Sequence, residues 1–241
     1  MDFVKLNFKK ILGFTYIIFF LIGLVFVFTL FDVSDFTNYN FIRENRNSII
    51  YYKENNFFFL TIIFFIIAVF WTLFLIPGLP TALFSGFVFG KWWGTLILVF
   101  ANTLGAVTLY FIIKIFFSKM VEKKLASKFS KIIEIIKKNE LFYFLCFRLI
   151  GGAGTPFPIQ NILPVVFNMS IKNYFIATLI GIVPVSFISV ALGSGIEKFI
   201  EQNTELSFKN IIFSPEIYFP ILGFFILLLL SILVKKKIFN K

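Results

Sequence analysis

The sequence predicts an all-α, polytopic membrane protein with about four full transmembrane helices and two inverted re-entrant hairpins. Hydrophobic residues make up 59% of the 241 residues, and the mean hydropathy of +0.93 lies far outside the range of soluble globular domains. Several apolar runs approach or exceed the roughly 20 residues that a helix needs to cross about 30 Å of hydrocarbon. Two of these runs are interrupted by proline and glycine, which distinguishes them from ordinary membrane-crossing helices.

Residues 1–56 are expected to form an N-terminal anchor helix and an external loop. The apolar run 11–31 follows three lysines, as in a signal peptide, but it is too long for the apolar region of a signal peptide and ends without a small-x-small cleavage site. We therefore expect an uncleaved anchor. Residues 32–56 have no excess of Lys and Arg over Asp and Glu, which is typical of an external segment.

The placement of lysine orients the remaining segments. Residues 118–140 contain seven lysines and the tail 235–241 contains four, so both are expected on the cytoplasmic side together with the N-terminus. Residues 195–217 lack such an excess and are expected outside. An odd number of crossings must then separate the external loop from 118–140, although two apolar pieces lie between them. The same count applies from 140 to 195, so one piece in each half must turn back.

The arrangement that satisfies this count has full spans at 11–31, 95–117, 171–193 and 218–234, and two hairpins that enter from opposite faces. The core 57–195 would consist of two repeats, 57–117 and 141–195, joined by the linker 118–140. Residues 196–241 would form an external loop, the last transmembrane helix and a basic tail. The run 57–76 is also long enough to cross on its own. We expect a multi-pass protein of the inner (plasma) membrane with both termini cytoplasmic.

The two broken segments also resemble each other in sequence. When Pro80 is placed on Pro158, several pairs coincide: Gly86 with Pro164, Phe89 with Phe167 and Gly90 with Asn168, followed after a two-residue gap by Ala101 with Ala177 and Gly105 with Gly181. Two such units of opposite topology form an inverted repeat. Broken segments at matching places in two halves indicate a transport site near the middle of the membrane.

Apolar residues in the linker 118–140 recur at helical spacing, opposite a lysine-rich face: Val121, Leu125, Phe129, Ile132, Ile133 and Ile136. This pattern predicts an amphipathic helix that lies flat on the cytoplasmic leaflet, with its lysines drawn to anionic headgroups. The alternative is a connecting helix that packs on its own protein.

The residue content excludes several classes of function. The chain has no histidine and a single cysteine, Cys146, so disulfide frameworks, Cys/His metal sites and His-dependent catalytic triads lack their residues. We expect no metal, no cofactor and no enzymatic activity. The net charge of +11 comes from residues between the apolar runs and at the two ends, which predicts membrane lipids rather than nucleic acid as partners. A homo-oligomer is left open.

Arg148 is the residue most indicative of a site, because it lies within the apolar run 141–150. A cation costs about 3 kcal/mol in hydrocarbon on insertion scales, and no Asp or Glu occurs in the predicted spans or hairpins. The guanidinium is therefore expected to bind an anionic, phosphate-bearing headgroup through its planar donor fork. The alternatives are a clamp on backbone carbonyls of the opposing loop, or snorkelling to the interface.

Other residues of the two hairpins complete the predicted site. Loop N–H groups of the second hairpin can meet an anion, and Asn161 is expected to cap the returning helix or to hydrogen-bond the break. Lys91 followed by Trp92 and Trp93 is typical first of an interfacial anchor. The residues predicted to contact lipid are Arg148, Gly154, Pro156, Pro158, Gln160 and Asn161 in the second hairpin, and Pro77, Pro80, Ser85, Gly86, Gly90 and Lys91 in the first.

The spaced glycines and prolines carry a resemblance to a known family. The motifs are Pro77-Gly-Leu-Pro80, Gly86-Phe-Val-Phe-Gly90, Gly94 and Gly105 in the first half, and Arg148, Pro156-Phe-Pro158, Asn161, Thr178, Gly181, Pro184 and Gly193-Ser-Gly195 in the second. Over about residues 57–195 the chain resembles the VTT-domain proteins of the DedA superfamily, also called SNARE-associated Golgi protein-like. It is most similar to the bacterial relatives of the Tvp branch.

The resemblance implies two inverted re-entrant hairpins and a role in moving lipids between leaflets. DedA proteins proper carry an acidic residue in the first hairpin and a second arginine shortly after the first in the second hairpin, whereas 57–93 has no carboxylate and 149–160 no arginine, which disfavours proton-coupled transport. The prediction is therefore scramblase- or flippase-like translocation of phosphate-bearing lipids. The alternative is a non-transporting structural factor for membrane-protein assembly or envelope integrity.

Overall fold

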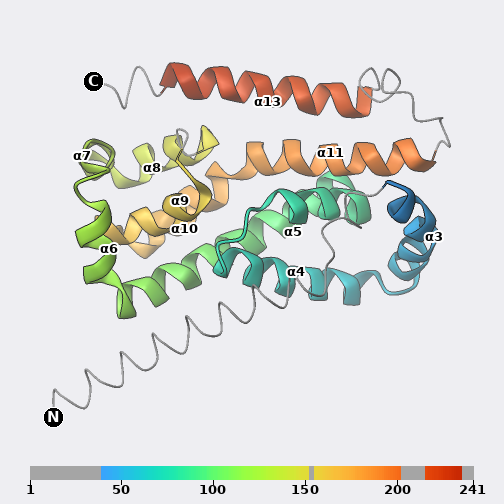
Figure 1. Ribbon diagram of the computed structural model, residues 1–241, viewed down its shortest axis with the longest axis horizontal. Coiled ribbons are helices and arrows are strands. Elements are labelled where there is room, and N and C mark those ends of the chain that lie inside the picture. Colours follow the sequence, from blue (N-terminus) through green and yellow to red (C-terminus); the bar gives the residue numbers. More distant parts are fainter. Residues whose placement is uncertain (1–38, 152–154, 202–214, 235–241) are drawn as a thin grey trace, which may run out of the picture.

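The computed structural model describes residues 39–151, 155–201 and 215–234, and these are helical without any strand (Figure 1). The predicted anchor 11–31 and the basic tail 235–241 lie outside the described residues. The helices are α3 (Tyr39–Asn55), α4 (Phe57–Leu73), α5 (Leu79–Phe116), α6 (Ser118–Leu125), α7 (Ser130–Lys138), α8 (Glu140–Leu149), α9 (Phe157–Val166), α10 (Ile171–Gly181), α11 (Val183–Glu201) and α13 (Pro215–Val234).

Two stretches of the described chain are long and apolar enough to cross a membrane. They are Leu79–Phe116, which is α5, and Ile171–Lys198, which joins α10 and α11. A third candidate is the pair formed by the end of α3 and α4, which is bent by 109° between Asn55 and Phe57. The predicted span 218–234 corresponds to α13. The all-α membrane class is thus confirmed.

Helix α5 folds back on itself at Gly90. This residue has φ 76° and ψ 171°, a backbone conformation open essentially to glycine alone. The Ser85 hydroxyl donates a hydrogen bond of 2.9 Å to the carbonyl of Gly94, although nine residues of straight helix would separate them by about 13 Å. Residues 79–89 therefore run antiparallel to residues 91–116.

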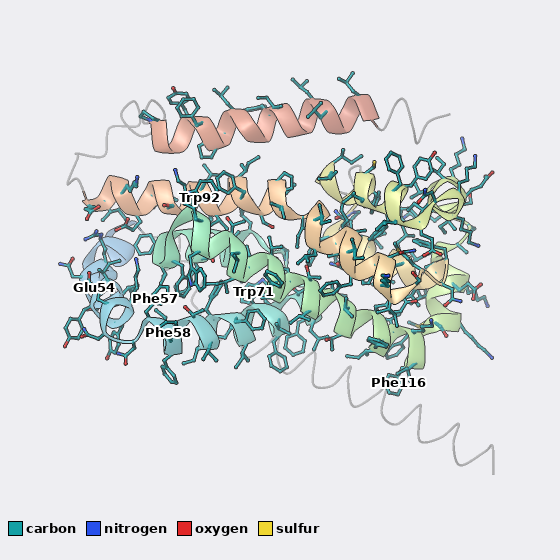
Figure 2. All side chains as sticks on the ribbon, turned by 180° about the vertical axis from the view of Figure 1, so that it is seen from behind. Glu54, Phe57, Phe58, Trp71, Trp92 and Phe116 are labelled. Atoms are coloured by element: carbon teal, nitrogen blue, oxygen red, sulfur yellow. The ribbon has the colours of Figure 1, made fainter. Side chains whose placement is uncertain are left out.

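Helix α4 and residues 79–89 form a first helical hairpin. The chain reverses between them at 74–78, where the sequence predicts a break, and the Phe64 ring packs on Phe84 and Phe89 with centroids 5.8 and 5.4 Å apart. Figure 2 shows Phe57 toward one end of the molecule, Trp71 near the middle and Phe116 at the other end. The first hairpin therefore ends near the middle of the molecule, whereas residues 91–116 of α5 continue to its other end.

Helices α8 and α9 lie on either side of the break 150–156, in the segment that the sequence predicts as the second hairpin, a name we keep for residues 140–166. Helix α8 packs mainly on α10 and α7, and α9 packs on α5 and α6. Each has 10 residues, which corresponds to about 15 Å or half of the hydrocarbon thickness. Neither helix can cross a membrane alone, so 141–170 is not an ordinary span. Figure 1 shows α8 and α9 toward the α6–α7 end of the molecule, whereas α4 extends toward the α3 end.

Both hairpins have left-handed corners at corresponding places. The first helix of each is followed two residues later by a positive φ, at Leu75 (57°) and Gly151 (66°). The returning segments end at Gly90 (76°) and Asn168 (56°), the pair that the sequence alignment superposes. These four positive-φ residues thus occur in the same order in each half.

Small residues let α11 cross the first hairpin at close range. A Cβ built on Gly86 would overlap the backbone of Val190 and Ser194, and one on Gly193 would overlap the backbone of Leu83. This is the close-packing role that GxxxG spacing serves in membrane helices. Buried Val190 and Ile200 of α11 join the apolar cluster that α4 and α5 form at this end.

The linker 118–140 differs from the predicted single helix. It forms two short helices, α6 and α7, separated at 126–129. Val121, Ile133 and Ile136 are buried in the apolar cluster that surrounds the second hairpin, with α6 against α9 and α7 against α8. Since protein covers these apolar side chains, the linker packs on its own protein, and the expectation of one continuous helix is wrong. Contact of its lysine-rich face with the cytoplasmic leaflet stays a prediction.

Candidate functional site

Arg148 lies in the last turn of α8 and is 3% exposed. Its Nη2 donates hydrogen bonds to Asn161 Oδ1 of α9, at 2.7 Å, and to the Tyr174 hydroxyl of α10, at 3.2 Å. The guanidinium carbon lies 5.2 Å from the Phe144 ring centroid and 5.8 Å from that of Tyr174, which are cation–π distances. Arg148 therefore joins three helices at the break of the second hairpin.

The charge of Arg148 has no carboxylate partner in the described part of the chain. The ion pairs found there join Arg46 to Glu197 at 2.6 Å and to Glu201 at 3.2 Å. Nε of Arg148 is buried and forms no hydrogen bond to any described residue. A buried cation and a buried unpaired donor both cost free energy, so this position is suited to an anion.

The loop of the second hairpin is closed by Gln160. Its Nε2 donates to the carbonyls of Gly151, at 3.1 Å, and Thr155, at 2.8 Å. Pro156 is the N-cap residue of α9 and Pro158 lies in its first turn, where a missing N–H is tolerated. Gly154 lies outside the described residues. These residues shape the non-helical backbone beside Arg148.

Asn161 does not cap the returning helix, so that part of the prediction is wrong. It lies inside α9, where its Nδ2 donates to the Phe157 carbonyl at 3.1 Å and its Oδ1 accepts from Arg148. Its side chain is 1% exposed. The alternative expectation, a hydrogen bond at the break, describes Asn161 correctly.

The contacts of Arg148 repeat a pattern from the first half. A Cβ built on Gly181 of α10 would overlap Arg148 and approach the Leu145 carbonyl; one on Gly105 of α5 would approach Thr72 and the Val69 carbonyl. Arg148 and Thr72 each lie three residues before a left-handed corner, Gly151 in one half and Leu75 in the other. Thr72 thus occupies the position that Arg148 has in the second half.

Sequence reasoning missed the polar partners on the long helices. Thr72 donates to Asn102 Oδ1 at 2.9 Å, and Tyr174 accepts from Arg148. The Tyr174 ring lies 5.5 Å from that of Tyr110, whose hydroxyl accepts from Lys114 Nζ at 3.3 Å. Arg148, Tyr174, Tyr110 and Lys114 thus form a continuous series of contacts from the buried guanidinium to an exposed ammonium group. Tyrosines and an asparagine inside apolar runs were the available signal.

The predicted residues of the first hairpin fall into different surroundings. The Pro77 carbonyl accepts from Trp71 Nε1 at 2.9 Å, and Pro80 lies in the first turn of α5. Ser85 is fully buried and bonded to Gly94, and Gly86 packs on α11. Gly90 forms the bend, and Lys91 is exposed beside a cavity. The described contacts of Ser85, Gly86 and Gly90 thus serve the fold.

Acidic side chains are sparse around the site. No group of three His, Cys, Asp or Glu residues converges anywhere in the described ranges. The groups that the structure describes at this position are the unpaired Nε of Arg148, the Tyr174 hydroxyl, and the aromatic faces of Phe144 and Tyr174. Such a set favours an anion over a metal ion.

Comparison with known proteins confirms the resemblance that the spaced glycines and prolines predict. Residues 76–195 match the VTT domain family, a segment that includes α5, the second hairpin and Arg148. The chain is 27% identical over 177 residues to the Transmembrane protein 41 homolog of Caenorhabditis elegans, which covers 72% of this chain and 68% of that protein. No solved structure is significantly similar. The chain is a multi-pass membrane protein of the VTT-domain family.

Proposed function

We propose that this protein moves phosphate-bearing lipids between the two leaflets of a membrane, with Arg148 meeting the headgroup phosphate. The observation that carries the proposal is a guanidinium buried among α8, α9 and α10 with no carboxylate beside it and with Nε unpaired. A phosphate would supply the missing negative charge and accept from the guanidinium fork. The lipid is not chemically altered, so the protein is not an enzyme in this proposal.

The two hairpins support a passage between leaflets. They extend from opposite ends of the molecule, and α8 and α9 are each about half a bilayer long (Figure 1). Non-helical backbone at such depth needs protein or water around it rather than lipid. We place the hairpins as re-entrant from opposite faces, with 91–116 and 171–198 as spans between them. The repeated corners and the Gly105–Gly181 correspondence support an inverted repeat.

The direction of movement follows the lipid gradient in this proposal. Residues 57–116 and 141–195 contain no Asp or Glu, so a proton-driven cycle lacks an intramembrane acid. We place the protein in the inner (plasma) membrane with its termini and α6–α7 on the cytoplasmic side. Scrambling then requires only that a headgroup leaves water for the Arg148 site and returns on the other face.

Leaflet exchange in liposomes tests the proposal. The purified protein is reconstituted with a trace of fluorescent phospholipid, and the fraction accessible to an external reductant is followed with time. Protein-free liposomes protect about half of the label, whereas active protein exposes nearly all of it. We expect Arg148→Gln to slow exchange at least tenfold, which corresponds to about 1.4 kcal/mol in the barrier.

Arg46→Gln is the matched control. Arg46 is the other arginine whose side chain the structure describes, and it pairs with Glu197 at the opposite end of the molecule (Figure 1). This variant should exchange lipid at the unmodified rate. Inactivity of the unmodified protein in liposomes would instead favour the structural factor, in which Arg148 serves only to hold α8, α9 and α10 together.

A further inference from the structure

A cavity of about 300 Å³ lies between α11 and α13, away from Arg148 and its partners. Its lining is mostly apolar and includes Phe187, Ile188 and Ala191 of α11 with Phe219 and Gly223 of α13. Two cations, Lys91 and Lys198, complete the wall. We propose that this cavity binds the headgroup of an anionic glycerophospholipid, held as a resident lipid and separate from the lipids that the protein moves.

The charges around the cavity favour an anion. Both lysines are exposed, and neither forms an ion pair with a residue that the structure describes. The nearest acidic residues on α11, Glu197 and Glu201, are both paired with Arg46 of α3. Because these carboxylates pair with Arg46 and not with Lys198, the Lys198 ammonium group is available to bind an anion. Lysine ammonium groups sit on flexible stems, so two of them can approach one phosphate.

The shape of the cavity favours a lipid over a free anion. A volume of about 300 Å³ is at the lower limit of small-molecule sites, which suits a phosphoglycerol group but not a whole lipid. The acyl chains would continue over the apolar surface of α13, where Phe219 is 61% and Leu222 50% exposed. A soluble phosphate would gain nothing from this apolar wall. The geometry therefore combines a cationic rim with a hydrocarbon surface.

Trp92 provides a reporter next to the cavity. Its ring lies 5.1 Å from that of Phe187, which lines the cavity, and 5.9 Å from the Lys91 ammonium. Figure 2 shows Trp92 beside α11. A spin-labelled lipid that quenches tryptophan should therefore quench Trp92 when its headgroup occupies the site. Trp92→Phe keeps an aromatic contact with Phe187 and identifies how much of the signal comes from Trp92.

The experiment compares quenching by doxyl-labelled phosphatidylglycerol and doxyl-labelled phosphatidylcholine at equal mole fraction in nanodiscs. We expect the anionic lipid to quench Trp92 at severalfold lower concentration than the zwitterionic lipid. The double variant Lys91→Gln, Lys198→Gln should abolish this preference, and both side chains are exposed, so the fold should be retained. Lys172→Gln is the control, since Lys172 is an exposed lysine at the start of α10.

Three results would overturn the proposal. The first is equal quenching by both lipids in the unmodified protein, and the second is a preference for the anionic lipid that persists in the double lysine variant. The third is a preference that inorganic phosphate removes, which would assign the site to a soluble anion. Arg148→Gln should leave the preference unchanged. The outcome is therefore independent of whether the protein exchanges lipid between leaflets.

Discussion

Arg148 packs directly against Gly181, so that α8 and α10 meet with no side chain on the α10 side of the contact. A Cβ at position 181 would overlap the Cβ of Arg148. Both atoms are close to their backbones and cannot move away as the end of a flexible side chain could. The position of the guanidinium therefore depends on the absence of a side chain one helix away.

Gly181→Ala should separate α10 from α8 and weaken the hydrogen bond between Arg148 and Tyr174. Overpacking of this kind costs about 1–3 kcal/mol. The free energy of unfolding would be measured by SDS titration in mixed micelles with circular dichroism as the signal. Gly78→Ala is the control, because Gly78 has φ −80° and a Cβ there meets nothing within 4 Å. Equal stability of the two variants would contradict the close contact.

Gly90→Ala tests the reversal within α5. No atom lies within 4 Å of a Cβ at this position, so the whole effect must come from the backbone conformation. We expect a loss of about 1–3 kcal/mol in unfolding free energy. Asn168→Gly, at the corresponding corner of the second half, should change stability by less than about 0.5 kcal/mol, since asparagine tolerates φ 56° nearly as well as glycine.

One stability result would contradict the reversal at Gly90. If Gly90→Ala were as stable as the unmodified protein, the reversal between 79–89 and 91–116 would not exist in solution. Both variants are measured by the same SDS titration, so differences in detergent or lipid content do not affect the comparison of their unfolding free energies.

Asn161→Ala should destabilise the second hairpin. Removing Oδ1 leaves the buried Nη2 of Arg148 with one acceptor fewer, and a buried donor on a charged group costs about 2 kcal/mol when unpaired. The melting midpoint in detergent is the measurement. Asn55→Ala is the control, because its Nδ2 donates to the Tyr51 carbonyl on an exposed surface. An equal fall in the melting midpoint of both variants would show that the hydrogen bond between Asn161 and Arg148 contributes no more to stability than an exposed one.

Much of the second hairpin could be predicted from local sequence. A cation in the apolar run 141–150 and two prolines at 156 and 158 indicate a buried charge beside a break, because neither feature is tolerated against lipid. The structure places Arg148 at 3% exposure immediately before that break. The role of Asn161 was only half predicted, since an amide five residues after the cap can bond inside its helix or across to another.

The first hairpin was harder to read. Gly90 and Gly86 both belong to one GxxxG pattern, yet Gly86 provides close packing on α11 and Gly90 provides a left-handed backbone. Spacing alone cannot separate these uses, because both require only the absence of a Cβ. The linker 118–140 was ambiguous for a related reason: an apolar helix face can be covered by lipid or by protein, and the pattern is the same.

The amino-acid sequence by itself determined the helical membrane class, the two breaks and the presence of an uncompensated cation, because hydrocarbon penalises polar groups wherever they occur along a chain. Only the tertiary structure decided that Tyr174 and Asn161 partner Arg148, that α5 reverses at Gly90, and that α6 and α7 pack on the second hairpin. These outcomes depend on which helices meet and, at Gly90, on the backbone conformation of a single residue, and neither leaves a distinct pattern in the local sequence.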